Sequence, residues 1–254
     1  MDALIGHTGF VGRNLASQRE YTDKFNSKNF RDMAGRTFDQ LVCAGVSAVK
    51  WQANKNPDED WSRIRELMDV LRETKAKRFI LISTIDVYAN PADADESFDN
   101  HTTPNHAYGT HRLQFEDFCR NHFETCHVIR LPALFGVGLK KNVVYDLLND
   151  NCLEMINPKS SFQYYDLNDL SDDIEKTTEA QIELVNLFTE PIQTQLIIDT
   201  FFPNKIVGTS PSKQAHYDLR TRHADVFGKS GNYVYTSNEV LAKLGSFIAG
   251  YNHA

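Results

Sequence analysis

Three glycines near the start of the chain limit its possible folds more than any other feature. Gly6-His7-Thr8-Gly9-Phe10-Val11-Gly12 fits the pattern G-x-x-G-x-x-G, directly after an apolar run at 2–5 and before an amphipathic stretch at 10–20. A strand, a glycine-rich turn and a helix in this order are typical of a dinucleotide site. The glycines permit a tight turn, close approach to a pyrophosphate and close helix packing, and N–H groups at the helix start attract phosphate. An ordinary tight turn is the alternative that this pattern alone leaves open.

The first two-thirds of the chain alternates short apolar runs with longer amphipathic ones. The runs predict strands at 2–5, 39–44, 78–83 and 127–131, and helices at 10–20, 61–71 and 107–122. The near-continuous apolar run at 78–83 is what a strand buried on both faces requires. Strands alternating with helices of this length predict an α/β fold with a doubly wound parallel sheet.

After residue 132 the pattern loosens. We expect helices at 143–149, 176–188 and 238–251 and a strand at 195–198. No second glycine-rich phosphate loop occurs there. We therefore predict a dinucleotide-binding domain over 1–150 and a small substrate-binding region over 151–254, partly interleaved with it.

Composition excludes several classes of protein. The chain of 254 residues is 41% hydrophobic and 24% charged, as in soluble globular proteins. It has no apolar run of the roughly 18 residues that a membrane span needs. Met1 leads into Asp2 without a basic or an apolar signal-peptide region, so we do not expect secretion. Four cysteines without a CxxC pair favour reduced thiols and a cytoplasmic location. The net charge of −7 disfavours a nucleic-acid partner, and the histidines show no metal-binding spacing. We expect a small-molecule partner.

The end of the second strand bears on which cofactor binds. An NAD enzyme usually has an acid about 20 residues after the glycines, for the ribose 2′-hydroxyl. Residues 25–29 contain none, and Asn26, Ser27 and Lys28 could accept a 2′-phosphate, with Arg13 near the loop. This favours NADP over NAD. The alternative is that Lys28 is only a solvated charge and that Asp23 supplies the acid from a shifted register.

Two further segments complete a recognisable set of motifs. Ile82-Ser83-Thr84-Ile85-Asp86-Val87-Tyr88 ends a buried strand, and Tyr108-Gly109-Thr110-His111-Arg112 begins a helix 24 residues beyond Thr84. With the glycine loop, they resemble the extended short-chain dehydrogenases/reductases, in particular the NAD-dependent epimerase/dehydratase family, which acts mostly on nucleotide sugars. Ala44-Gly45 and residues 130–136 also match. The resemblance is good over 1–150 and implies a Rossmann-like fold.

The resemblance implies roles for individual residues. Thr84 would hydrogen-bond the reacting hydroxyl, and Tyr108 would move its proton while hydride passes to or from the nicotinamide. The residues expected at the cofactor are Gly6, Thr8, Gly9, Phe10, Val11, Gly12, Asn26, Ser27, Lys28, Ala44, Gly45, Ser83 and Pro132. A phenol near pKa 10 is a poor base at neutral pH, so positive charge must lie nearby.

Arg112 is the main departure from the family pattern, which has lysine four residues after the tyrosine. Arginine keeps the positive charge but cannot deprotonate, and its planar fork is less suited to compact contacts with a ribose. We expect Arg112 either to assist Tyr108 or the ribose, or to pair with Glu116 one helical turn further on.

The remaining positions narrow the reaction. Relatives that dehydrate sugars carry Asp and Glu after the threonine, where this chain has Ile85 and Asp86, so 4,6-dehydration is disfavoured. Asp86 serves either as a second acid or as a cap on the turn. Arg220 and Arg222 could bind a diphosphate or be ordinary surface charges. The sequence thus predicts an NAD(P)-dependent oxidoreductase or epimerase of sugars or nucleotide sugars, with a catalytically reduced NAD(P)-binding redox sensor as the alternative. The family also suggests a homodimer through helices 61–74 and 107–122.

Overall fold

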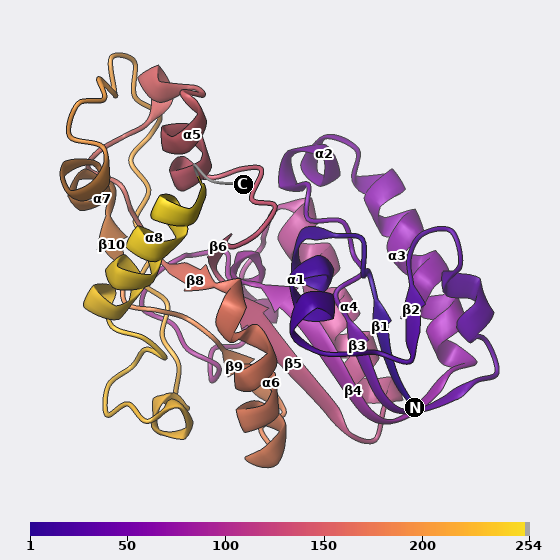
Figure 1. Ribbon diagram of the computed structural model, residues 1–254. Coiled ribbons are helices and arrows are strands. Elements are labelled where there is room, and N and C mark those ends of the chain that lie inside the picture. The colour runs from indigo at the N-terminus through magenta and orange to yellow at the C-terminus, as the bar shows by residue number, and fades with distance from the viewer. Residues whose placement is uncertain (252–254) are drawn as a thin grey trace.

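The computed structural model describes residues 1–251 and has a six-stranded parallel sheet at its centre. The strand order is β2-β1-β3-β4-β5-β9 (Figure 1). The strands are β1 (Asp2–Ile5), β2 (Asp23–Phe25), β3 (Thr37–Cys43), β4 (Lys75–Thr84), β5 (Cys126–Leu131) and β9 (Leu184–Asn186). Every neighbouring pair is parallel. The predicted doubly wound parallel sheet is confirmed.

Helices cover both faces of this sheet, which explains its apolar central strands. All six residues of β5 are buried. One face packs against α3 (Pro57–Arg72) and α4 (Ala107–His122), and the other against α1 (Phe10–Gln18) and α6 (Leu170–Glu179). The apolar stripe of α3, buried in the first of these cores, consists of Ile64, Leu67, Met68 and Leu71. Such a three- and four-residue spacing places side chains on one helical face.

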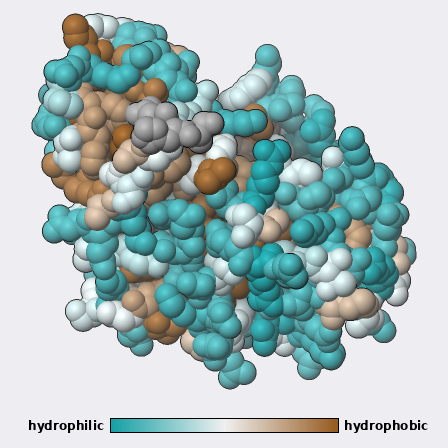
Figure 2. All heavy atoms as spheres, in the orientation of Figure 1, coloured by the Kyte–Doolittle hydropathy of each residue, from teal (hydrophilic) through white to brown (hydrophobic). Residues whose placement is uncertain are grey.

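A second group of elements lies beside the carboxyl ends of the central strands. It contains two two-stranded sheets, β6–β8 and β7–β10, and three helices. The bounds are β6 (Ala133–Phe135), β7 (Ser161–Phe162), β8 (Tyr164–Asp166), β10 (Ile192–Gln193), α5 (Val143–Asn149), α7 (Thr194–Phe201) and α8 (Ser237–Tyr251). These helices share a third apolar core, and hydrophobic residues gather at the surface of this part of the molecule (Figure 2).

The two parts of the chain are interleaved rather than sequential. Residues 164–166 form β8, α6 then packs on the central sheet, and β9 pairs with β5 at its edge. The chain returns afterwards to the second group of elements (Figure 1). In residues 1–251, no helix is long and apolar enough to cross a membrane.

Short elements complete the chain. α2 (Lys50–Lys55) precedes α3, and six 3-10 segments connect longer elements. They are η1 (Phe30–Met33), η2 (Ile85–Val87), η3 (Asn100–Thr102), η4 (Leu153–Met155), η5 (Leu167–Asp169) and η6 (Ala224–Phe227). Of these, η2 directly follows β4 and lies beside the candidate site.

Two predicted elements are wrong. The stretch 176–188 is not one helix, because α6 ends at Glu179 and Gln181 adopts a left-handed φ of 55°, after which the chain forms β9. The stretch 195–198 is helical, within α7, rather than a strand. Its run of Leu and Ile has high strand propensity, but Ile197 and Ile198 pack against α8 in the third core, and this tertiary packing decides the conformation.

Candidate active site

The glycine loop packs as closely as a dinucleotide site requires. Gly6 has φ +86°, and a Cβ added there would lie 2.5 Å from the carbonyl oxygen of Ala44. A Cβ on Gly12 would lie 2.1 Å from the Gly6 carbonyl oxygen. The Gly9 N–H donates to that same oxygen at 2.9 Å, which closes the turn. A side chain at Gly12 would therefore push α1 away from the loop, and one at Gly6 would push the loop away from Ala44 and Gly45.

The other residues predicted at the cofactor surround this loop unevenly. Thr8 and Gly9 are exposed, whereas Phe10 and Val11 are half-buried and pack on the apolar cores. Ala44 and Gly45 follow β3 beside the loop, where the Ala44 N–H donates to Ile5 at 2.9 Å. Pro132 follows β5 and is buried. The Ser83 side chain contacts α4 instead, because its hydroxyl lies 2.5 Å from a carboxylate oxygen of Glu116.

The end of β2 carries amide, hydroxyl and ammonium groups beside the glycine loop. The Nδ2 atom of Asn26 lies 3.1 Å from Nε2 of His7 in that loop. Ser27 and Lys28 follow and are exposed. Asp23 lies at the start of β2 opposite Ala3, and it pairs with Arg36 at 2.6 Å. The Asp23 carboxylate is thus held at the far end of the strand from the loop.

Thr84 and Tyr108 meet at the carboxyl end of β4. Tyr108, in the first turn of α4, is 5% exposed, and the Thr84 side chain lies close enough to its phenol to influence its pKa. The Thr84 hydroxyl also accepts the Asp86 N–H at 3.1 Å. Burial raises the pKa of the Tyr108 phenol; the Arg112 charge lowers it, Asp86 raises it, and the Thr84 contact lowers it. The net pKa lies above its ordinary value.

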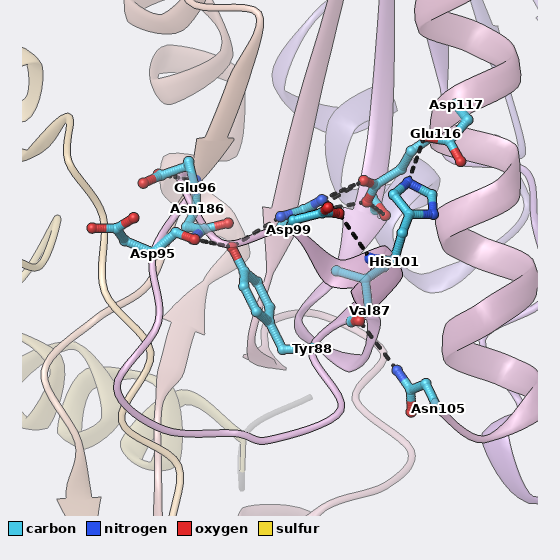
Figure 3. Close-up of polar contacts among 12 residues, drawn as sticks. Val87, Tyr88, Asp95, Glu96, Asp99, His101, Asn105, Glu116, Asp117 and Asn186 are labelled. Atoms are coloured by element: carbon cyan, nitrogen blue, oxygen red, sulfur yellow. Dashed lines mark hydrogen bonds and ion pairs between the residues drawn. The ribbon is translucent and has the colours of Figure 1, made fainter. Parts of the chain in front are cut away.

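Contacts at the start of α4 fix the position of this tyrosine. Asn105 donates to the carbonyls of Asp86, at 2.9 Å, and of Val87, at 3.1 Å, and Figure 3 shows the second contact. Gly109 lets the helix approach η2, because a Cβ there would lie 2.3 Å from the Asp86 carbonyl oxygen. His106 caps the helix by accepting the Gly109 N–H at 3.0 Å.

Arg112 lies against Tyr108 but its N–H groups serve other partners. The guanidinium carbon is 4.3 Å from the centroid of the Tyr108 ring. Its terminal nitrogens bind both Asp60 oxygens, at 2.7 and 3.0 Å, and the carbonyl of Ser47 at 2.5 Å. The expected pairing with Glu116 is not made, because Glu116 faces the sheet and binds Arg130 there at 2.6 Å.

Asp60 is the common partner of two α4 side chains. Besides Arg112, it contacts Nδ1 of His111 at 2.8 Å. Burial raises the pKa of the Asp60 carboxyl, but hydrogen bonds and charge from Arg112 and His111 outweigh it, so the pKa lies below its usual value. Asp60 lies on α3 one turn before Ile64, and the sequence analysis did not identify it.

Asp86 follows Thr84 by two residues and is paired with a lysine. Its carboxylate lies 2.6 Å from the ammonium of Lys50, the first residue of α2. One turn later in α2, the side-chain oxygen of Asn54 accepts the Tyr108 N–H at 2.9 Å. The sequence analysis did not identify Lys50 or Asn54, although their i, i+4 spacing places both on one face of a helix.

A buried polar network connects α4 to the second part of the molecule (Figure 3). Arg130, bound to Glu116, donates to the Tyr88 hydroxyl at 2.9 Å, and Asn186 donates to the same hydroxyl at 2.8 Å. The Asn186 N–H in turn donates to Glu96 at 2.7 Å. The network ties the segment between β4 and α4 to β9.

Arg220 and Arg222 lie in a segment held by this network. The Glu96 carboxylate accepts the Arg222 N–H at 2.9 Å. The Arg220 guanidinium lies 3.2 Å from Asp93 and 3.6 Å from Asp218, so its charge is already compensated. The Arg222 side chain is exposed. Neither arginine contacts the Thr84–Tyr108 pair.

Comparisons with known proteins agree with this architecture. A family model described as "NAD dependent epimerase/dehydratase family" matches residues 20–154, which is more than half of the chain. The matched range contains Thr84 and Tyr108 but begins after the glycine loop. No curated protein sequence matches the chain.

Several solved structures share the fold at low sequence identity. A UDP-glucose 4-epimerase from Thermotoga maritima, solved with UDP-glucose, has a TM-score of 0.71 and 14% identity over 100% of this chain and 99% of that one. A dTDP-4-dehydrorhamnose reductase from Bacillus anthracis, solved with NADP, has a TM-score of 0.74 and 15% identity over 97% and 98%. An NAD dependent NDP-hexosamine 5,6-dehydratase involved in tunicamycin biosynthesis has a TM-score of 0.74 and 15% identity over 99% and 97%.

Proposed function

Since the chain belongs to the NAD dependent epimerase/dehydratase family, we propose that it is an NAD(P)-dependent enzyme that oxidises, reduces or epimerises a sugar carbon in a nucleotide sugar. The observation that carries this proposal is the position of the buried Tyr108 phenol beside Thr84 at the carboxyl end of β4. In open parallel sheets, ligands bind beside the carboxyl ends of the strands.

The glycine loop fits a dinucleotide. The missing Cβ of Gly12 lets the start of α1 lie close to the backbone of the loop, and the missing Cβ of Gly6 lets the loop lie close to Ala44 and Gly45. N–H groups at that helix start would bind the pyrophosphate. Asn26, Ser27 and Lys28 would bind a ribose 2′-phosphate, so we favour NADP as the cofactor.

Thr84 and Tyr108 act on the substrate oxygen. When bound, the nicotinamide exchanges a hydride with the carbon that carries this oxygen. The Thr84 hydroxyl orients the oxygen by a hydrogen bond, and Tyr108 takes the proton from the hydroxyl during oxidation or returns it during reduction. Positive charge from Arg112 over the ring stabilises the phenolate that forms.

The side chains around this pair favour redox chemistry or epimerisation over 4,6-dehydration. Ile85 stands where water elimination would need a carboxylate, and Asp86 is paired with Lys50. Substrate recognition belongs to the segments after residue 151. Of the two candidate arginines, Arg222 suits a diphosphate better, because acidic partners already surround Arg220. The UDP-glucose bound to the Thermotoga epimerase supports a nucleotide sugar as the substrate class.

A fluorescence titration with a turnover assay tests the proposal. Purified protein is titrated with NADPH and NADH, and hydride transfer is then followed with UDP-, dTDP- and GDP-linked hexoses, uronates and keto-sugars. Epimerisation is followed by chromatography of the sugar products. Cofactor binding with turnover of at least one nucleotide sugar is the expected result. Absence of cofactor binding would overturn the proposal.

A redox sensor is the second candidate function, and the position of Arg112 favours it. Three of the five N–H groups of the guanidinium are bound to Asp60 and Ser47, which leaves fewer of them for a nicotinamide ribose. A sensor would bind NADPH and NADP+ with different affinities and would turn over none of the sugars. Turnover by the wild-type protein that Tyr108→Phe abolishes would exclude this candidate.

A further inference from the structure

Three ion pairs surround the start of α4, and they differ in exposure. Glu116–Arg130 and Asp60–Arg112 have side chains that are less than a tenth exposed. In the Lys50–Asp86 pair, by contrast, the lysine side chain is 39% exposed and the aspartate side chain 19%. The first two pairs are therefore closed to solvent and ligands, whereas the third is partly open to solvent.

The geometry points to the Lys50–Asp86 pair as a second element, besides Arg112, that adjusts the charge next to Tyr108 and so shifts how readily this tyrosine gives up its proton. The importance of that proton rests on the proposed function; the electrostatic coupling itself does not. Lys50 is a positioning residue in this scheme, acting on Tyr108 through Asp86. No motif of the sequence marks it.

Asp86 is built into the tyrosine site by its backbone. Its N–H donates to Thr84, its carbonyl accepts from Asn105, and Gly109, next to Tyr108, packs on that carbonyl. These contacts leave the Asp86 side chain little freedom to move away. An unpaired carboxylate here would oppose a phenolate at Tyr108, since like charges destabilise one another. The Lys50 ammonium, 2.6 Å from Asp86, compensates that charge.

The segment that carries Lys50 is fixed from the same side. Asn54, one turn along α2, accepts the Tyr108 N–H, so one face of α2 contacts both the tyrosine backbone and Asp86. Arg112 cannot replace Lys50 in compensating the charge of Asp86. Its guanidinium binds Asp60, whose negative charge offsets part of its effect and itself raises the pKa of Tyr108.

Other titratable groups near the pair come from three further elements. His106, at the start of α4, has a pKa lowered by burial and by the charge of Lys50, and raised in part by Asp86. The Lys141 ammonium donates to the Ala48 carbonyl, and its pKa is lowered by burial, raised in part by Asp86 and lowered by Lys50. Both groups therefore respond to the charges of the pair.

Tyr217, from the segment before Arg220, also faces the pair. Burial raises the pKa of its phenol, Asp86 raises it further and Lys50 lowers it. The side chain packs on the apolar cluster that contains Ile85 and Val87. The groups that respond to Lys50–Asp86 thus come from both parts of the chain, and the pair lies where the two parts meet.

The test measures Tyr108 ionisation directly and needs no substrate. The full-length protein is labelled with 3,5-difluorotyrosine, whose phenol ionises nearer neutral pH than tyrosine. Its fluorine NMR signals are titrated with pH, and the Tyr108 signal is assigned by its loss in Tyr108→Phe. Four variants are compared with wild type: Lys50→Met, Asp86→Asn, the double variant, and Lys55→Met as a control on an exposed lysine of the same helix.

Opposite charge changes must move the Tyr108 midpoint in opposite directions. Lys50→Met exposes the Asp86 charge and shifts it to higher pH, whereas Asp86→Asn leaves the Lys50 charge and shifts it to lower pH. The double variant returns it toward wild type, and Lys55→Met leaves it unchanged. An unchanged midpoint in folded Lys50→Met, or shifts of the same sign in both single variants, would overturn the inference. Because no turnover is measured, a failure of the proposed function leaves this result readable.

Discussion

The guanidinium carbon of Arg112 lies 4.3 Å from the centroid of the Tyr108 ring, while its nitrogens hold both oxygens of Asp60. One arginine thus supplies positive charge over the ring and also fastens α4 to α3. The second task requires the planar fork, which presents parallel donors to a carboxylate, and a lysine could not reproduce it.

Replacing this arginine should first affect stability. Arg112→Lys keeps the charge but loses the bidentate contact and the bond to Ser47, so we expect a loss of about 1–3 kcal/mol in the free energy of unfolding. Arg112→Ala leaves Asp60 buried and unpaired, with a loss of about 3–5 kcal/mol. Urea unfolding followed by circular dichroism measures both. A Lys variant as stable as wild type would show that Arg112 has no structural task.

The Asp60–Arg112 pair also predicts a dependence of stability on pH. Because the pKa of Asp60 is lower in the folded protein than in the unfolded chain, the pair stabilises the fold fully above the unfolded pKa, about 4. This contribution is lost as the pH falls through the folded pKa. The difference in unfolding free energy between wild type and Asp60→Asn should therefore be largest near neutral pH and shrink on acidification. A difference that grows in acid would contradict this assignment.

The close packing of the glycine loop predicts that a single methyl group disrupts it. A Cβ on Gly12 would lie 2.1 Å from the Gly6 carbonyl oxygen, so Gly12→Ala must displace α1. We expect a loss of about 1–3 kcal/mol in stability, typical of overpacking, and weaker NADPH binding. Gly231→Ala is the matched control, because no atom lies within 4 Å of its added Cβ. Equal behaviour of the two variants in thermal unfolding and NADPH titration would refute the packing argument.

The end of β2 predicts a preference for NADP. Lys28→Ala should weaken NADPH binding about tenfold, as expected for one lost charge-assisted contact to a phosphate, with little change for NADH. Lys24→Ala, which changes an exposed lysine of β2 four residues earlier, controls for the general loss of positive charge. Fluorescence titrations with both cofactors measure the effect. Tighter binding of NADH than NADPH by the wild type would show that the cofactor is NAD.

Local patterns in the sequence were sufficient for the four inner strands of the central sheet and for the placement of Thr84 and Tyr108, but not for the edge strand β9. The apolar strands are short and continuous because helices bury both of their faces, and this leaves a signal in the sequence. The glycine loop and the tyrosine helix depend on neighbouring residues only. In the second half, the helix over 194–201 was missed because β-branched residues there pack on α8, a contact between segments far apart in sequence.

The partners within the candidate site were harder to predict for the same reason. Lys50 reaches Asp86 and Asp60 reaches Arg112 across 36 and 52 residues of chain. No periodicity links such positions. The i, i+4 pair of Arg112 with Glu116, one of the two alternatives expected for Arg112, does not form. Glu116 binds Arg130 on β5 instead. The sequence therefore named Thr84, Tyr108 and Arg112, but not Lys50 and Asp60, which pair with residues of the candidate site.

Turnover by Tyr108→Phe tests the central claim most directly. The variant removes one hydroxyl from a buried side chain and leaves the glycine loop intact, so NADPH binding should be unchanged. With any nucleotide sugar that the wild type converts, we expect kcat to fall at least about a hundredfold, the lower range for losing a general acid/base. Hydride transfer is followed by the absorbance of the reduced nicotinamide, in parallel with the NADPH titration. Wild-type kcat in the variant would contradict the account.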